Sequence, residues 1–124
     1  MLKHDKAFSS FSVKDLEEAR QFYAEVLGME ASVNEYTLEL KIGGEQSVMV
    51  YPKLNHTPAS FTVLNFPVDD ISSAVDHLVS KGIVFEIYDD PEFKTDERGI
   101  MRGEGPLIAW FKDPSSNILS IIQE

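Results

Sequence analysis

Hydrophobic and polar positions near the start of the chain predict a strand followed by a capped helix. Residues 7–13 have strand character, and beyond them apolar residues recur at the three- and four-residue spacing of an amphipathic helix. Asp15 is placed to cap this helix, because its side chain can accept hydrogen bonds from the exposed N–H groups of the first turn. Gly28 is placed to end it, because glycine tolerates the left-handed conformation at no steric cost. The pattern therefore predicts a helix over residues 15–27.

A hairpin and a polar linker follow this helix. Residues 36–42 alternate between apolar and polar side chains, Gly43 and Gly44 turn the chain, and residues 46–52 return as a second strand. The segment 53–59 is polar and contains proline, so it predicts a linker between two parts of the chain.

The same order of elements returns in the second half. Residues 60–68 predict a strand, Asp70 takes the capping position of a second amphipathic helix, and Gly82 closes that helix. A short strand is predicted over residues 83–88, and the segment 89–105 is long and polar. The last two predicted strands form a closing hairpin over residues 106–112 and 117–123.

The two halves align with a shift of 55 residues, which places Asp15 on Asp70 and Val13 on Val68. One strand, one helix and about three further strands make each half, and one such sheet leaves its second face uncovered. We therefore expect an α+β fold made of two paired modules. The expected organisation is a single domain over residues 1–124, with a first module over 7–52, a linker over 53–59 and a second module over 60–123.

Composition narrows the classes of function. The formal net charge of −10 repels the phosphates of a nucleic acid and attracts cationic ligands. The chain has no cysteine, so disulfides and thiolate chemistry are excluded. No apolar run approaches the roughly 20 residues that span a membrane, and the polar segment 1–7 lacks the apolar stretch of a signal peptide. We expect a cytoplasmic protein that contacts neither nucleic acid nor membrane.

Two segments resemble the vicinal oxygen chelate superfamily, which includes glyoxalase I, bleomycin-resistance proteins and extradiol dioxygenases. Residues 11–29, FSVKDLEEARQFYAEVLGM, are similar to the first module of that family. Residues 109–119, AWFKDPSSNIL, are similar to its closing hairpin, except that Ser116 stands where glycine is usual. The resemblance covers nearly the whole chain. It implies two paired βαβββ modules that form a curled, cup-like mixed sheet with the helices outside.

The resemblance also implies where a metal would be held. Metal-using members carry His, Gln or Glu ligands on the first and last strands of each module. The corresponding positions here hold poor metal ligands, namely Phe8, Val50, Val63 and Ser120. The two residues on either side of each position include no His, Asp, Glu or Gln either. We therefore expect the metal site of the family to be absent, and we expect no cofactor.

A small molecule, aromatic or cationic, could instead be bound inside the cup by the side chains that alternation places on its inner face. If Phe8 faces the cup, so does Ser10, while Phe11 and Val13 face the helices. The segment 89–105 is either a lid or a plain surface loop, and the pattern leaves open which face Trp110 takes. The predicted ligand-binding residues are Phe8, Ser10, Phe61, Val63, Asn65, Met101, Arg102, Trp110 and Ser120.

Three functions are compatible with these residues. The first is a metal-free binding protein that sequesters a toxic or antibiotic compound, and the lack of metal-ligating side chains favours it. An enzyme is therefore the less favoured class. The second is a lyase, isomerase or dioxygenase with a relocated metal site that uses Glu39, His56 or His4. The third is an interaction module whose pocket has closed. Relatives with one pair of modules per chain usually complete their cups across a two-fold interface, so we also expect a homodimer.

Overall fold

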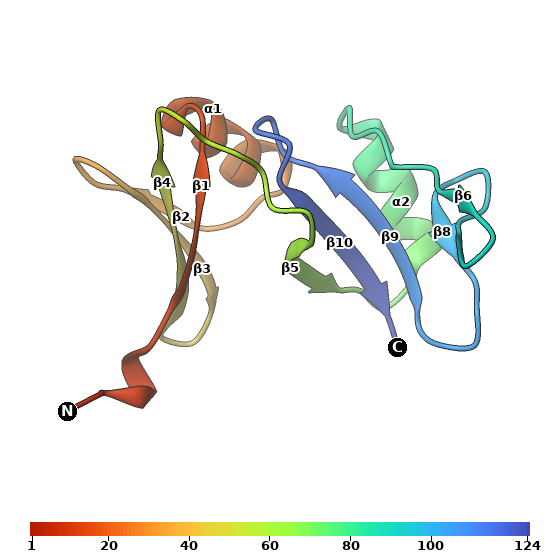
Figure 1. Ribbon diagram of the computed structural model, residues 1–124, viewed down its shortest axis with the longest axis horizontal. Helices are drawn as coiled ribbons and strands as arrows, with labels where there is room; N and C mark the ends of the chain where they lie inside the picture. The colour runs from red at the N-terminus through yellow and green to blue at the C-terminus, as the bar shows by residue number, and fades with distance from the viewer. The chain divides into compact units, whose positions relative to one another are not determined.

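Each half of the chain folds into one four-stranded mixed sheet with a helix packed on it (Figure 1). The computed structural model describes all residues from 1 to 124, which divide into two compact units, Met1–Pro58 and Ala59–Glu124. We call the sheet of the first unit sheet A and the sheet of the second unit sheet B. The mixed α+β class predicted from the sequence is confirmed.

The first unit begins with a short 3-10 turn at His4–Lys6. Its helix α1 covers Leu16–Arg20 and continues as a π-helical turn over Gln21–Val26, where the sequence predicts one uniform helix. The four strands of sheet A are β1 (Ser9–Val13), β2 (Ala31–Val33), β3 (Leu38–Gly43) and β4 (Gln46–Pro52). Their order in the sheet is β1-β4-β3-β2, so the first and last strands of the unit lie side by side.

The second unit repeats this arrangement with one addition. Its helix α2 covers Ile71–Ser80. The strands of sheet B are β5 (Thr62–Pro67), β8 (Ile100–Met101), β9 (Leu107–Lys112) and β10 (Ile118–Gln123), in the order β5-β10-β9-β8. The addition is a small hairpin of β6 (Asp89–Asp90) and β7 (Phe93–Lys94). In each sheet the first strand runs parallel to the last, as β1 does to β4 and β5 to β10.

Both helices start at the aspartates that the sequence predicts as caps. The Asp15 carboxylate accepts from the N–H of Glu18 at 3.1 Å, and the Asp70 carboxylate accepts from the N–H of Ser73 at 3.2 Å. Such caps satisfy N–H groups that have no partner within the helix, and each is worth about 1 kcal/mol. The repeat detected in the sequence is therefore a repeat of structure.

One face of each sheet is buried under its helix. In sheet A the register aligns Phe11, Val50 and Leu38 in one row, and the Phe11 ring lies 6.0 Å from that of Tyr23 on the π-helical turn. In sheet B the helix-facing row includes Phe111 and Leu119, which are almost fully buried. Complete burial of a side chain of this size contributes about 1.5–3 kcal/mol. The prediction that Phe11 and Val13 face the helix is confirmed.

The strand predicted over residues 83–88 is wrong. Only an isolated bridge joins Phe85 to Phe111, and the N–H of Glu86 donates to the carbonyl of Trp110 at 2.8 Å. Gly99 returns the chain beside this bridge with a φ of +86°, and a Cβ there would lie 2.9 Å from the Cβ of Phe85. Residues 85–86 and β8 therefore both pair with β9 at this edge of sheet B, and the hairpin of β6 and β7 lies between them in the sequence.

Neither helix is long and apolar enough to cross a membrane.

Candidate ligand-binding site

The face of sheet B turned away from α2, which we call the distal face, gathers four of the nine side chains predicted to bind a ligand. Ser120 pairs with Asn65 on one side and with Trp110 on the other, so these three side chains share that face. Met101 joins the same face from β8, since it pairs with Ile108, two residues before Trp110. The Ser120 hydroxyl is fully buried and donates to the Asn65 side-chain oxygen at 2.5 Å.

A bulge changes which residue of β5 reaches the distal face. The register shifts between Ile118 and Leu119, so Ile118 pairs with Thr62 and Leu119 with Leu64, while Val63 is the extra residue. The Trp110 indole N–H donates to the Thr62 hydroxyl at 3.2 Å. Strict alternation would give this place to Val63. The structure gives it to Thr62, a hydrogen-bonding side chain.

Three aromatic rings from different segments meet on the distal face. The Trp110 indole lies 5.8 Å from the Tyr88 ring and 4.9 Å from the Phe93 ring, and the last two rings are 5.1 Å apart. Only 8% of Trp110 is exposed, whereas 39% of Phe93 is. We call these three residues the aromatic cluster. Its outermost ring belongs to Phe93, on the hairpin.

The hairpin is held in place by Thr95, which is buried. The backbone N–H of Tyr88 donates to the Thr95 hydroxyl at 3.0 Å, and the Thr95 N–H donates to the Tyr88 carbonyl at 2.9 Å. Burial raises the pKa of the Tyr88 phenol, and the nearby charge of Glu86 adds to this rise while Lys112 opposes it. Tyr88 therefore stays a neutral phenol at neutral pH, and the cluster presents uncharged rings.

The rest of the segment 89–105 is an ordered turn around Asp96. Its carboxylate accepts from the N–H of Arg98 at 2.8 Å, from the N–H of Ile100 at 2.9 Å and from the Arg102 guanidinium at 3.0 Å. Burial alone would raise the pKa of Asp96, but these hydrogen bonds outweigh it and lower the pKa below its ordinary value of 3.8. Arg102, which the sequence predicts to bind the ligand, is thus engaged by Asp96 in this turn.

The remaining predicted residues lie elsewhere. Phe61 directly precedes β5 and is 67% exposed, and Phe8 directly precedes β1 and is 63% exposed. Ser10 lies on the face of sheet A turned away from α1, in one row with Met49 and Glu39. The structure brings Asn65, Met101, Trp110 and Ser120 together on sheet B; Phe8 and Ser10 belong to the other unit.

One of the four expected metal-ligand positions was placed on the wrong face. Val50 is fully buried in the row beneath the helix, so it cannot project from the opposite face of sheet A. Its neighbours Met49 and Tyr51 take that face, and neither offers the imidazole or carboxylate that divalent transition metals prefer. Phe8, Val63 and Ser120 are no better as donors. The side chains present do not fit the metal of the family.

The residues suggested for a relocated metal site do not form a metal-binding group. The Glu39 carboxylate lies 3.1 Å from the Lys41 ammonium, and His56 Nδ1 lies 2.7 Å from the Ser12 hydroxyl. His4 is exposed on the 3-10 turn. Nowhere does the structure assemble three or more His, Asp or Glu side chains in a geometry that could hold a metal ion.

The sequence profile of the Glyoxalase/Bleomycin resistance protein/Dioxygenase superfamily matches residues 8–121. The chain belongs to this superfamily. Solved structures agree with it in fold. One is a glyoxalase family protein from Enterococcus faecalis, 20% identical with a TM-score of 0.69, for which the match covers 98% of this chain and 99% of the other. Another is TnmS3, an antibiotic-binding protein from Streptomyces sp. CB03234, 22% identical with a TM-score of 0.67 and 95% of both chains covered.

Three side chains of this glyoxalase-fold site were missed by sequence reasoning. The sequence pattern places Tyr88 at the end of a predicted strand and Phe93 in a polar segment, and it marks neither as a ligand-binding residue. A turn signal was available, because Pro91 stands between these two aromatics. Thr62 carried no such signal, since its position depends on the bulge at Val63.

Proposed function

We propose that this chain is a metal-independent small-molecule-binding protein of the glyoxalase/bleomycin-resistance type, which sequesters a toxic or antibiotic compound. The observation that carries the proposal is the aromatic cluster of Trp110, Tyr88 and Phe93, held rigidly on the distal face of sheet B with one ring partly exposed. A rigid aromatic surface beside a few polar groups is typical of a site for a small organic molecule.

The cluster favours a ligand with a flat ring. Stacking or edge-to-face contact with an aromatic side chain contributes about 0.5–1.5 kcal/mol beyond the burial of area. Phe93 offers the accessible ring, and Trp110 and Tyr88 hold it from behind. The half-exposed amide of Asn65 supplies a hydrogen-bonding group on the same face, with its orientation fixed by Ser120.

The charges around the hairpin favour a cationic ligand. Asp89, Asp90 and Glu92 are exposed on it, and only Asp89 has an ion pair, with Lys94 at 3.7 Å. A cation placed over an aromatic face gains about 0.5–1 kcal/mol at an exposed site. Because the whole chain carries a net charge of −10, long-range attraction acts in the same direction.

Two observations support a binding function over metal catalysis. The family's ligand positions hold side chains that do not suit a divalent transition metal, as described for Phe8, Val63 and Ser120. Among proteins of the same fold, TnmS3 is described as an antibiotic-binding protein, which shows that the fold serves such a role elsewhere.

We further propose that the two units form a single domain and that the protein works as a homodimer in the cytoplasm. Two-fold dimers are the commonest assemblies of soluble proteins, and relatives with one module pair per chain usually build their cups across such an interface. The absence of cysteine agrees with a reducing compartment.

Fluorescence of Trp110, the only tryptophan, tests the proposal directly. A thermal-shift screen against metabolites and antibiotics identifies candidate ligands, because a compound that binds only the native state raises its stability. A true ligand should then change the emission of Trp110 saturably. Trp110→Phe should bind better than Trp110→Ala, because it keeps a ring in the cluster.

Phe93 provides the matched pair of variants. Phe93→Leu keeps apolar volume and removes the ring, whereas Phe93→Tyr keeps the ring. We expect the leucine variant to lose about three- to tenfold in affinity and the tyrosine variant to bind like wild type. A ligand that raises the melting temperature but leaves Trp110 emission and both variants unaffected would place the site elsewhere. A library without any hit would favour the interaction module.

A further inference from the structure

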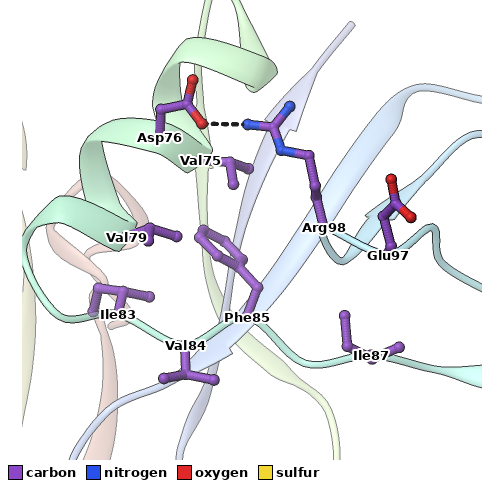
Figure 2. A pocket seen from close by; sticks show the side chains of 9 residues that line it. All are labelled: Val75, Asp76, Val79, Ile83, Val84, Phe85, Ile87, Glu97 and Arg98. Atoms are coloured by element: carbon purple, nitrogen blue, oxygen red, sulfur yellow. Dashed lines mark hydrogen bonds and ion pairs between the residues drawn. The ribbon is translucent and has the colours of Figure 1, made fainter.

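A second hollow lies on the opposite side of sheet B, between α2 and the segments that follow it (Figure 2). Val75 and Val79 of α2 form one wall, and Ile83, Phe85 and Ile87 form the floor and the other wall. The hollow has a volume of about 540 Å³, within the range of about 300–1,000 Å³ that small-molecule sites occupy. It is separate from the aromatic cluster, because Phe85 packs on the helix-facing residue Phe111 and not on Trp110.

The apolar lining is unusually accessible for aliphatic side chains. Val79 is 53% exposed, Ile87 is 57% exposed and Val84 is 78% exposed. Burying them would be favourable, at about 25 cal/mol per Å² of apolar surface. Three side chains are too few for the core of a stable dimer, which needs about 800 Å² from each partner. A compact small molecule fits the hollow better than a second copy of the chain.

The rim of the hollow carries charge that is only partly compensated. Arg98 donates to the Asp76 carboxylate at 2.6 Å (Figure 2). It also donates to the Ser72 hydroxyl at 2.8 Å and to the Ser72 carbonyl at 3.0 Å, so its charge is already engaged. Glu97 lines the hollow from the same loop, is exposed and makes no ion pair. The rim therefore has one carboxylate in excess, and this excess complements a positive charge.

We propose that this hollow binds a compact aliphatic or aromatic ammonium ion, with its apolar part against Val79 and Ile87 and its charge beside Glu97. An anionic ligand would meet Glu97 unfavourably and would have to displace Asp76 from Arg98. The site uses none of the residues of the aromatic cluster, so it is independent of the function proposed for that cluster.

Methyl NMR of the full chain, labelled at Ile and Val, tests the site with benzyltrimethylammonium as the probe. We expect saturable shifts at the methyl groups of Val79, Val84 and Ile87. Benzenesulfonate, which has a similar ring and the opposite charge, should bind at least threefold more weakly. Trp110 emission during the same titration reports separately on the aromatic cluster.

Two variants and one control complete the test. Glu97→Gln should weaken the probe by about two- to fivefold, because an exposed ion pair is worth at most about 1 kcal/mol. Ile87→Ser should weaken it by roughly fivefold through lost apolar contact. Glu45→Gln removes an exposed carboxylate from the first unit, which contributes no residue to either site, and should bind like wild type.

Three results would overturn the proposal. One is the absence of saturable shifts at these methyl groups. Another is equal binding of the sulfonate, or equal binding by Glu97→Gln and the unaltered chain. The third is a dependence of the same methyl shifts on protein concentration before any probe is added, which would show that a second copy occupies the hollow.

Discussion

The hydroxyl of Ser120 and the side-chain oxygen of Asn65 lie 2.5 Å apart, although 55 residues separate them in the sequence. The bond joins β10 to β5 and orients the amide on the distal face of sheet B. The two partners differ in accessibility, since Ser120 is fully buried and Asn65 is exposed enough to reach water. Because of this difference, removing either side chain should cost a different amount of unfolding free energy.

We predict that Asn65→Ala destabilises the protein more than Ser120→Ala. The first variant leaves a buried hydroxyl without its acceptor, which costs about 1–3 kcal/mol, and the second leaves an amide that water can satisfy, which costs about 1 kcal/mol. Urea unfolding of both variants measures the difference. A larger loss of unfolding free energy in Ser120→Ala would contradict this account.

Ser116, at the position where glycine is usual in the closing hairpin, holds the left-handed conformation. Its φ is +69°, the only positive value at a non-glycine residue. Since a side chain in that region costs roughly 1–2 kcal/mol, Ser116→Gly should raise the unfolding free energy by about 1 kcal/mol. Ser116→Ala is the control, because it keeps the Cβ and should show no such gain.

The turn around Asp96 should make stability depend on pH in the acid range. The pKa of Asp96 is lower in the folded state, so its ionised form stabilises the fold above the unfolded-state pKa, and this contribution is lost as the pH falls through the folded value. Asp96→Asn should therefore show a shallower fall in unfolding free energy below about pH 4. Identical slopes in wild type and variant between pH 5 and pH 2, taken as rough limits for an aspartate, would refute the assignment.

Metal analysis tests whether the side chains at the family's metal-ligand positions can hold a divalent metal. Purified untagged protein, refolded with excess Ni, Zn, Mn and Fe and then desalted, should retain less than one tightly bound equivalent per chain, because the positions include Phe8, Val63 and Ser120. One retained equivalent of any of these metals, measured by elemental analysis, would show that the protein does hold a metal and would contradict its proposed metal independence.

Oligomeric state is tested by light scattering at micromolar concentration. A homodimer has twice the chain mass of 14.0 kDa. A single species at the chain mass would contradict the proposed assembly. A dimer that persists in Val84→Asp and Ile87→Asp would also show that the hollow beside α2 is not its interface.

Local rules predicted those parts of the fold that depend on neighbouring residues. The caps at Asp15 and Asp70 and the turn glycine at Gly28 lie where the sequence placed them, because a cap needs only the residues of one helical turn. The strand pairs that form hairpins were found for the same reason. Each of these features is determined within a few residues.

Features that depend on distant partners were not predictable in this way. The bulge at Val63 arises from the pairing of β5 with β10, and it moves Thr62 to the distal face against simple alternation. Counting residues along the chain predicts Val50 at a metal-ligand position, but Val50 lies beneath the helix. Such a count does not determine which face of a strand is buried. Phe93 became part of the site only through its contact with Trp110.

The parallel pairing of the first and last strands has a consequence for synthesis on the ribosome. In sheet B, β10 lies between β5 and β9, so the centre of the sheet is missing until residues 118–123 have been translated. Gln123 even accepts a hydrogen bond from the N–H of Ile71 at the start of α2, 52 residues upstream. At about 5–20 residues per second, the nascent second unit therefore spends seconds with β5 lacking its partner strand, and the unpaired edge is open to misfolding and chaperone capture during that time.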